Sequence, residues 1–346
     1  MSDVRLETNG TKFGGWKEIR IQRGIEQISG QFELGHTEKW SGQNTPRPIR
    51  PGAPCRISID GETVITGHID DVDPQYSSRS HSITAKGRDA TADLVDCSAL
   101  SFQWKDQTLL QGAEKLCRPF GIRVRADIDV GAAFTFKNNE GETVFEILER
   151  AARIRGLLLI SDGQGGLLIT RAGTKRATGR LVLSKNIKEA KGHFSHRSRF
   201  SSYTIKGQSK GNTFSDAVQA YQIMAEVTDQ AIKRHRPMTI VEDDPIDVAA
   251  AKTRATWQRN VNAGRSQRVT YTVQGWRDQG DALWSPNWLI PVDDDYMGIN
   301  QEMLITTVTL ILDDQGERAE LTVMLPEAFD LIELPEPKED EGGFGA

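Results

Sequence analysis

Residues 55–70 read CRISIDGETVITGHID, and in this stretch apolar and polar side chains alternate on both sides of Asp60 and Gly61. Alternation with a period of two is typical of a strand that buries one face. An Asp-Gly pair between two such runs favours a two-residue hairpin, because both positions of its tight turn require positive φ angles. The stretch therefore predicts an antiparallel β-hairpin.

The same alternation continues on both sides of this hairpin. It recurs at residues 19–21 and 30–34, and a second hairpin is expected between residues 68–72 and 80–85 through the polar segment 76–79. Short strands at close spacing are typical of a small antiparallel barrel or sandwich. We therefore assign residues 1–97 to a first β-barrel.

After residue 98 the apolar spacing becomes helical. One helix is expected from residue 109, with Asp106 as its N-cap and Pro119 at its end, followed by a strand at residues 121–124. Thr143 and Glu146 have the spacing of a capping box and predict a second helix. That helix should end at Gly156, before strands at residues 157–160 and 167–170 that are joined by a turn at residues 162–166.

The two helix–glycine–strand units align at an offset of 35 residues, from Thr108 on Thr143 to Val124 on Leu159. Two unrelated amphipathic helices would explain the apolar spacing but not the matching glycine and strand after each. We therefore predict a small α/β domain at residues 98–175 with an internal duplication.

The rest of the chain returns to β alternation, at residues 200–205, 268–273, 303–310 and 319–324. We assign residues 176–210 and 265–330 to a second β-barrel. Residues 211–264 form an inserted segment with a helix, for which Asp244 is the expected N-cap and Pro245 the first helical residue. Residues 331–346 are predicted to be an acidic, flexible tail.

The two β regions share a short sequence echo. Residues 65–69 and 83–85 resemble residues 305–309 and 321–323. Both a duplicated barrel and β alternation by itself explain such an echo. The fold class is thus mainly β with an α+β insert.

Composition excludes several classes of protein. The 346 residues carry 43 basic and 48 acidic side chains, a net charge of −5 that disfavours the coating of nucleic acid. Three cysteines without C-x-x-C spacing predict neither a disulfide framework nor a zinc site. The N-terminus lacks the pattern of a signal peptide, and no apolar stretch approaches the ~20 residues of a membrane span. We expect a soluble protein without a membrane anchor.

Two common nucleotide-binding and metalloprotease motifs do not occur in the chain. The sequence has no G-x-x-x-x-G-K-[ST] and no H-E-x-x-H motif. Gly163 and Gly165 resemble half of a dinucleotide loop, but a strand follows where a phosphate-binding helix should begin. His193 and His196 lack a nearby acidic ligand, which disfavours a metal site.

Two acidic clusters are candidate sites. Residues 293–295 are three adjacent aspartates without the spacing of a calcium loop. Asp70, Asp71 and Asp73 could be glycosidase carboxylates, although such catalysis needs two carboxyl groups in unlike environments. We expect no catalytic, cofactor-binding or metal-binding residues, no cofactor and no enzymatic activity.

The segment from residue 150 to residue 210 is strongly basic, with 14 Lys and Arg residues against Asp162 and Glu189. It is either a solvated face balanced by acidic residues elsewhere or a docking surface for an acidic neighbour. The sequence leaves both explanations open.

Several phrases, taken together in their order, resemble the baseplate hub proteins of contractile tails. They lie at residues 55–70, 109–122, 141–150, 199–208, 273–277 and 283–290. The family includes the Mu-type phage hubs, to which the resemblance is strongest, together with late control protein D, the T-even phage hub and the N-terminal half of type VI VgrG spikes. The resemblance covers roughly residues 15–330.

The resemblance implies a structural virion protein of the tail baseplate. Family members look like homotrimers in which two related barrels per subunit form a pseudo-sixfold ring between the tail tube and the central spike. The implied partners are the spike, the tube, other baseplate proteins and a tape-measure protein in the lumen, with DNA only in transit. Assembly would take place in the host cytoplasm. The alternatives are a type VI spike hub, although VgrG continues into a needle where this sequence ends at Ala346, and a cell-wall hydrolase.

Overall fold

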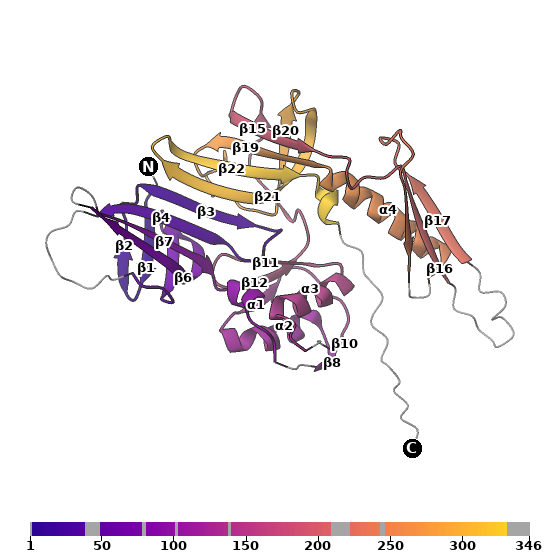
Figure 1. Cartoon of the computed structure of the whole chain (residues 1–346), viewed down its shortest axis with the longest axis horizontal. Helices are drawn as coiled ribbons and strands as arrows, with labels where there is room; N and C mark the ends of the chain where they lie inside the picture. The colour runs from indigo at the N-terminus through magenta and orange to yellow at the C-terminus, as the bar shows by residue number, and fades with distance from the viewer. Residues whose placement is uncertain are drawn as a thin grey trace, which may run out of the picture.

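The computed structural model describes residues 2–38, 49–77, 81–100, 103–137, 140–208, 222–242 and 246–330. A curved, mostly antiparallel sheet dominates the molecule, with a small α/β domain below it and an arm of strands and one long helix to the side (Figure 1). Fourteen strands belong to this sheet. Its two halves come from the beginning and the end of the chain, so the fold is mainly β as expected.

The first half of the sheet has the strand order β3-β4-β7-β6-β5-β1-β2. The predicted hairpin at Asp60 and Gly61 is confirmed, and these residues have φ angles of 51° and 87°. The second hairpin also forms, although residues 78–80 of its turn lie outside the described residues. The strands are β1 (Val4–Thr8), β2 (Thr11–Phe13), β3 (Glu18–Gly24), β4 (Gln31–Glu38), β5 (Pro54–Ile59), β6 (Glu62–Tyr76) and β7 (His81–Asp89).

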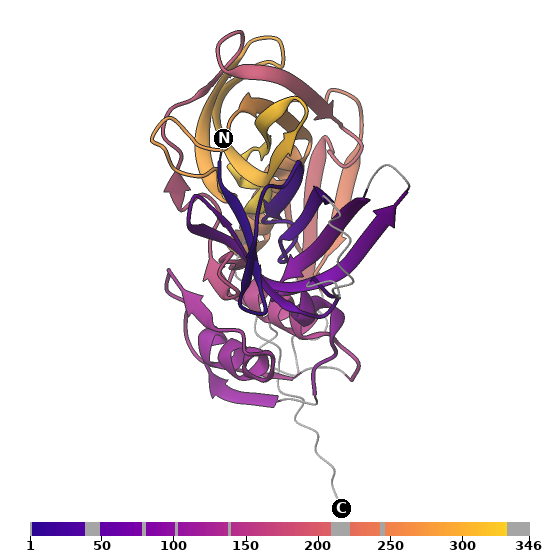
Figure 2. The ribbon, with the colours of Figure 1, turned by 90° about the vertical axis from the view of Figure 1, so that its left-hand side faces the viewer.

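The second half has the order β15-β19-β22-β21-β20, and its strands curve around a common interior (Figure 2). Two short strands, β13 and β14, pair in parallel with β20. A 3₁₀ turn, η2 (Pro326–Phe329), follows the last strand. The strands are β13 (Lys175–Arg176), β14 (Leu181–Val182), β15 (Ile187–Phe194), β19 (Gln267–Gln274), β20 (Trp288–Asp294), β21 (Ile299–Asp313) and β22 (Gly316–Met324).

The two halves are joined within the chain by strand pairing. Residues 307–312 of β21 pair antiparallel with residues 19–24 of β3. One apolar core, containing Ile21 and Ile57 from the first half and Leu321 and Val323 from the second, runs through both. Among the described residues no pairing closes either half on itself, so closure into barrels stays a prediction.

The strand order of the two halves is the same. β3, β4, β7, β6 and β5 occupy the places that β15, β19, β22, β21 and β20 occupy in the other half. β6 and β21 each have 15 residues, and each has a bulge where it pairs with the next strand. The bulges follow Ile69 and Ile305, so these two residues correspond, whereas the sequence echo had aligned Ile65 with Ile305. The echo was out of register by an even number of residues, which preserves the buried face.

The α/β domain contains the two predicted helix–strand units. Both helices begin with a complete capping box, from Thr108 to Gln111 and from Thr143 to Glu146. The predicted N-cap Asp106 is therefore wrong, because the Thr108 hydroxyl accepts the hydrogen bond from the Gln111 N–H. The strand expected from residue 121 begins only at Val124. The elements are α1 (Ala92–Asp96), β8 (Gln103–Gln107), α2 (Leu109–Cys117), η1 (Arg118–Phe120), β9 (Val124–Ala126), β10 (Phe134–Lys137), α3 (Val144–Ile154), β11 (Leu158–Ser161) and β12 (Leu167–Thr170).

The arm consists of a three-stranded sheet and a helix. Its elements are β16 (Ser202–Gln208), β17 (Gln222–Thr228), β18 (Pro237–Val241) and α4 (Val248–Arg265). The sequence had placed β16 in the second barrel, but β16 pairs with β17 and β18, and Tyr203 and Ile205 pack against α4. The N-cap of α4 is Asp247, whose carboxylate accepts from the Ala250 N–H. The predicted cap at Asp244, with residues 243–245, lies outside the described residues, as does the tail at residues 331–346.

Candidate functional site

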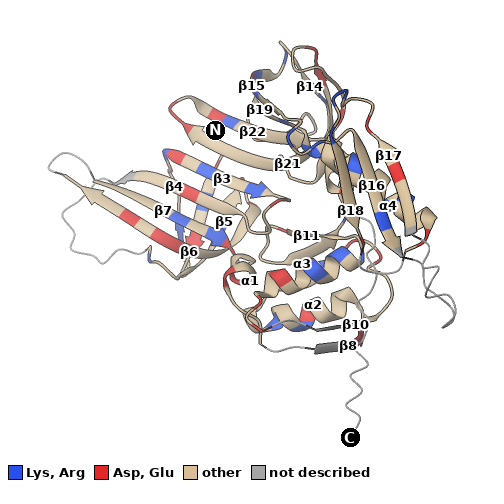
Figure 3. Cartoon of the chain, turned by 45° about the vertical axis from the view of Figure 1, so that its right-hand side comes forward, with Lys and Arg blue, Asp and Glu red and all other residues tan. Residues whose placement is uncertain are grey.

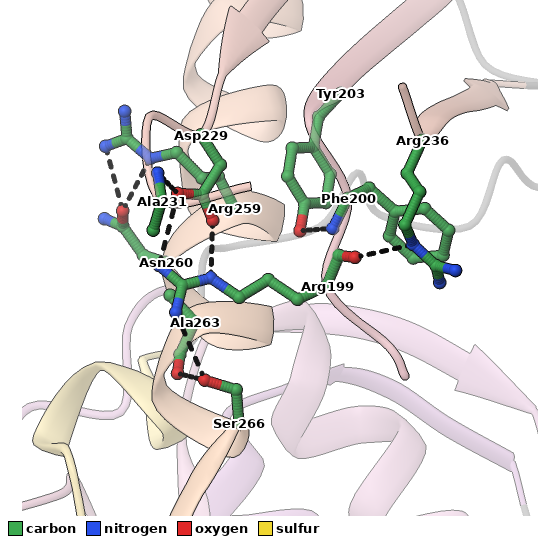
Figure 4. A network of polar contacts seen from close by, with 10 residues as sticks. All are labelled: Arg199, Phe200, Tyr203, Asp229, Ala231, Arg236, Arg259, Asn260, Ala263 and Ser266. Atoms are coloured by element: carbon green, nitrogen blue, oxygen red, sulfur yellow. Dashed lines mark hydrogen bonds and ion pairs between the residues drawn. The ribbon is translucent and has the colours of Figure 1, made fainter. Parts of the chain in front are cut away.

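A buried ion pair lies at the root of the arm (Figure 4). The Arg199 guanidinium donates from Nε to Asp229 Oδ2 at 2.6 Å and from Nη2 to Oδ1 at 3.2 Å. Only 13% and 7% of the two side chains are exposed. The Ala231 N–H donates to the same carboxylate at 3.0 Å. This two-pronged contact fixes the relative orientation of both groups.

The same arginine connects the arm to the end of its helix. Arg199 Nη1 donates to Ser266 Oγ at 3.4 Å, and Ser266 is the C-cap of α4, directly before β19. The Arg236 guanidinium donates to the Arg199 carbonyl at 3.2 Å and lies 5.1 Å from the centre of the Phe200 ring. The network therefore ties together the segments that meet where the arm leaves the sheet.

Asp229 is held in its charged form. Burial would raise its pKa, but hydrogen bonds from Arg199 and Ala231, and the positive charges of Arg199 and Arg259, lower the pKa below its ordinary value. A buried carboxylate that accepts its hydrogen bonds from its own chain has a structural role, here at the root of the arm. The sequence analysis missed this pair because its members are 30 residues apart and carry no motif.

Asp70 and Asp73 of β6 form ion pairs with basic residues of β7, and Figure 3 shows acidic and basic positions on these neighbouring strands. Arg88 of β7 contacts Asp70 and Asp96, each at 2.8 Å. Lys86 of β7 lies 3.3 Å from Asp73. Because these carboxylates are neutralised by neighbouring cations, they do not form the pair in unlike environments that glycosidases use.

The three aspartates at the end of β20 have separate roles. Asp293 forms an ion pair with Arg180, and Asp295 accepts a hydrogen bond from Asn300 at 2.7 Å. Asp294 is 1% exposed and accepts from the Met297 N–H at 3.1 Å, which stabilises the turn into β21. Burial, followed by the charge of Asp294, raises the pKa of the Tyr271 hydroxyl. The carboxylates do not converge on a common point.

The histidines and the glycine loop take ordinary structural positions. His193 lies on β15 and His196 in the loop after it, and both are exposed. Gly163 and Gly165 belong to the turn between β11 and β12, where the Asp162 carboxylate accepts from the backbone N–H of Gln164 and Gly166. This turn lies against β6, since a Cβ on Gly163 would come within 2.7 Å of the Val64 carbonyl.

The basic segment from residue 150 to residue 210 is partly balanced by acidic neighbours. At least six of its basic residues are in ion pairs with acidic ones. Several of these acids come from other parts of the chain, such as Glu142, Glu302 and Asp293. The structure therefore favours the first explanation, in which acidic residues elsewhere balance the segment.

A hollow of about 840 Å³ lies between the α/β domain and the arm. Arg155 and Arg171 line it from one side, Lys252 and Trp257 from the other, and Asp330 lies at the end of the described chain. In the part of the chain that the structure describes, its lining contains no histidine or cysteine. Three basic side chains and one acidic side chain thus line the hollow.

Among the described residues, β6 and β15 are two strands of the main sheet with an edge that no strand covers. β6 pairs with β5 only up to His68, so its residues from Asp70 onward have a strand on one side alone. β15 pairs only with β19. Both edges carry an exposed aromatic ring, Tyr76 with 82% and Phe194 with 50% of its surface exposed. Exposed edges of this kind are templates for another strand. Sequence alternation shows which face is buried but not which edge is free, so the sequence analysis missed them.

Metal-binding clusters and membrane-spanning helices are both absent from the described residues. No group of three or more His, Cys, Asp or Glu side chains gathers there in a way that could hold a metal ion. No helix there is long and apolar enough to cross a membrane. Within the described residues, the features that stand out are the uncovered edges of β6 and β15 and the buried Arg199–Asp229 pair.

Family models match four successive parts of the chain. Residues 3–89 match the N-terminal domain of Mu phage baseplate assembly protein GpP-like proteins, and residues 91–171 the second domain of gp44-like baseplate hub proteins. Residues 199–258 match the third domain of NMB1110-like tail proteins. Residues 247–332 match the fourth domain of Mu phage GpP.

Known proteins match over nearly the full length. The chain is 36% identical to baseplate hub protein gp44 of Escherichia phage Mu, covering 98% of this chain and 92% of that protein. It is 40% identical in sequence to the 43 kDa tail protein of prophage MuSo2 from Shewanella oneidensis. The crystal structure of that protein matches with a TM-score of 0.84, covering 95% of this chain and all of that one. A tail protein from Neisseria meningitidis is 25% identical over 96% of this chain and 99% of that one, with a TM-score of 0.79. An Escherichia coli component of the type VI secretion system, 13% identical over 96% of this chain and 80% of that one, shares the fold with a TM-score of 0.56.

Proposed function

This chain belongs to the baseplate hub proteins of Mu-like phages and is a structural protein of the virion tail, and on that premise we propose that three copies form a ring between the tail tube and the central spike. The observation that carries the proposal is the repeated strand order of the two halves of the sheet. Three copies with two equivalent halves each present six similar units. Such a ring matches a sixfold tube on one side and a threefold spike on the other.

The proposed partners follow from this position. One face of the ring contacts the tube and the other face the spike, and neighbouring baseplate proteins bind the periphery. The lumen holds the tape-measure protein and later passes DNA. Assembly takes place in the host cytoplasm, and the ring acts mechanically, without a cofactor or a catalytic step.

We predict that the purified protein forms trimers. Light scattering coupled to size exclusion should give about three times the 38.4 kDa of one chain. A closed ring buries two edges per copy, so the mass should hold across a tenfold dilution. A mass of one chain at high concentration would contradict the proposal.

A cell-wall hydrolase is the alternative from another class. It is disfavoured because Asp70, Asp73 and Asp293 are each neutralised by a basic neighbour. We expect the purified protein not to release soluble fragments from peptidoglycan, and Asp293→Ala to leave that result unchanged. Release of fragments by the unmodified chain and its loss in Asp293→Ala would establish the hydrolase instead.

The other alternative is the hub of a type VI spike. The type VI component shares the fold but only 13% of the sequence, whereas the Mu-type proteins share 36% and 40%. Similarity at this level supports a phage tail as the setting of this chain.

A further inference from the structure

We infer that the joint between the two halves of one chain recurs between chains, where β6 of one copy pairs antiparallel with β15 of the next. This inference rests on the proposed ring and specifies its contact surface. Within the chain, β21 of the second half pairs with β3 of the first half. In the repeat, β21 corresponds to β6 and β3 corresponds to β15. The strands that occupy the two partner positions, β6 and β15, thus both have an uncovered edge.

The uncovered part of β6 is the part that the inference requires. In β21, residues 307–312 pair with β3, beyond the stretch that β20 covers. The bulges align Ile305 with Ile69, so residues 307–312 correspond to residues 71–76. These are the residues of β6 that lie beyond its pairing with β5.

The ladder also fixes the register of the contact. Gln22 pairs with Gln31 of β4, which pairs with Arg88 of β7, and His193 pairs with Arg268 of β19, which pairs with Met324 of β22. Arg88 and Met324 occupy matching positions, because the offset that aligns Ile69 with Ile305 also aligns these two residues. Gln22 and His193 therefore correspond. Thr309 pairs with Gln22 inside the chain, and Thr309 corresponds to Asp73. Asp73 of one copy should therefore lie opposite His193 of the next, with residues 71–76 facing residues 190–195.

The side chains in this register are complementary on both faces of the sheet. The inner face would bring Val72, Pro74 and Tyr76 against Phe194, Gly192 and Ala190. Val72 and Ala190 already pack against the core of their own copy, as their counterparts Val308 and Ile19 do. The contact would cover the exposed Tyr76 and Phe194 rings. Pro74 lacks an N–H, so the ladder relies on the other backbone groups.

The outer face would place two acidic residues of β6 near one basic residue of β15. It would bring Asp71, Asp73 and Gln75 against Ser195, His193 and Lys191. Cross-strand pairs of opposite charge stabilise an antiparallel ladder, and like charges opposite one another destabilise it. Arg20, which corresponds to Lys191, pairs with Ile311 in the joint within the chain, and its guanidinium lies 3.8 Å from Glu320 of β22.

The test is a disulfide across the contact. Residues directly opposite in an antiparallel pair have Cα atoms about 4.5–5.5 Å apart, within the range of a disulfide. We would combine Asp73→Cys with His193→Cys in a chain that also carries Cys97→Ser, because Cys97 is the exposed cysteine of the described residues. Burial raises the pKa of the Cys55 and Cys117 thiols to about 12, so these two remain unreactive. Oxidation should convert most of the protein into a covalent three-chain species.

The control moves one cysteine along the strand. Asp73→Cys with Glu189→Cys places the thiols four residues out of register, roughly 13 Å apart, and should not form the covalent species. Equal cross-linking by both pairs would overturn the register. A trimeric mass without cross-linking of the matched pair would overturn the strand contact and leave the ring intact. A monomeric mass without cross-linking would overturn both.

A charge change tests the contact without cysteines. Lys191→Glu would place a carboxylate beside Asp73 of the neighbouring copy, and we expect at least tenfold weaker association by analytical ultracentrifugation. Lys233→Glu makes the same change on the exposed loop between β17 and β18 and should leave association unchanged. Equal effects of the two variants would overturn the contact.

Discussion

Replacing Gly67 with alanine is expected to destabilise the first half of the sheet by about 3 kcal/mol, at the upper end of overpacking costs. A Cβ at this position would lie 2.0 Å from the Arg88 carbonyl and 2.5 Å from the Asp89 Cα. Both atoms belong to the backbone of β7, so no side-chain rotation can relieve the clash. The two strands would have to separate where β6 passes from its pairing with β5 to its pairing with β7.

Chemical denaturation followed by tryptophan fluorescence would measure the loss. Gly10→Ala is the matched control, because Gly10 has a φ angle of 75° but no atom within 4 Å of the position that a methyl group would take. Its cost should be about 1 kcal/mol, the penalty of a left-handed conformation alone. Equal losses in the two variants would show that strand β7 can move aside.

The same variant should also weaken assembly. The edge of β6 that we assign to the copy-to-copy contact begins four residues after Gly67. A displaced β6 would carry this edge out of register. We therefore expect Gly67→Ala to lower the trimer fraction even under conditions where the chain remains folded.

Local signals in the sequence predicted local structure well. The hairpin at Asp60 and Gly61 formed because only a tight turn with positive φ angles suits this pair between two alternating runs. The capping box at Thr143 formed because its two side chains satisfy N–H groups that a helix leaves unpaired. Such signals depend only on residues that lie close together in the sequence, so the sequence alone was enough to predict these two elements.

Longer-range features could not be predicted in this way. β16 alternates like a strand of the second half, but pairing with β17 and packing on α4 place it in the arm. The Arg199–Asp229 pair forms because the same long-range pairing and packing in the arm bring these two residues together. Alternation has a period of two, so it determines the buried face and leaves both the sheet and the register undetermined. The echo between the two halves was shifted by an even number of residues for this reason.

Breaking the Arg199–Asp229 pair is the other change with a large expected effect. Arg199→Met should destabilise the protein by about 3–5 kcal/mol, because it leaves the buried Asp229 carboxylate without its cation. Adding Asp229→Leu should restore much of the loss, since an apolar pair of similar volume avoids the cost of an uncompensated charge. Arg153→Met is the control, because the Arg153–Glu149 pair is 59% and 45% exposed. Removing such a surface pair should cost at most about 1 kcal/mol.

The pH dependence separates this electrostatic cause from lost packing. In the unmodified chain the pKa of Asp229 lies below its ordinary value of 3.8, so its stabilising contribution is present above that value and is lost as the pH falls through the lower, folded-state pKa. In Arg199→Met burial acts unopposed by Arg199 and should raise the pKa of Asp229. Protonation then relieves the buried charge, so the stability difference between variant and unmodified chain should shrink as the pH falls from about 7 toward about 4.5. Denaturant titrations at both pH values would measure this difference, and a constant one would show that Arg199 acts through packing alone.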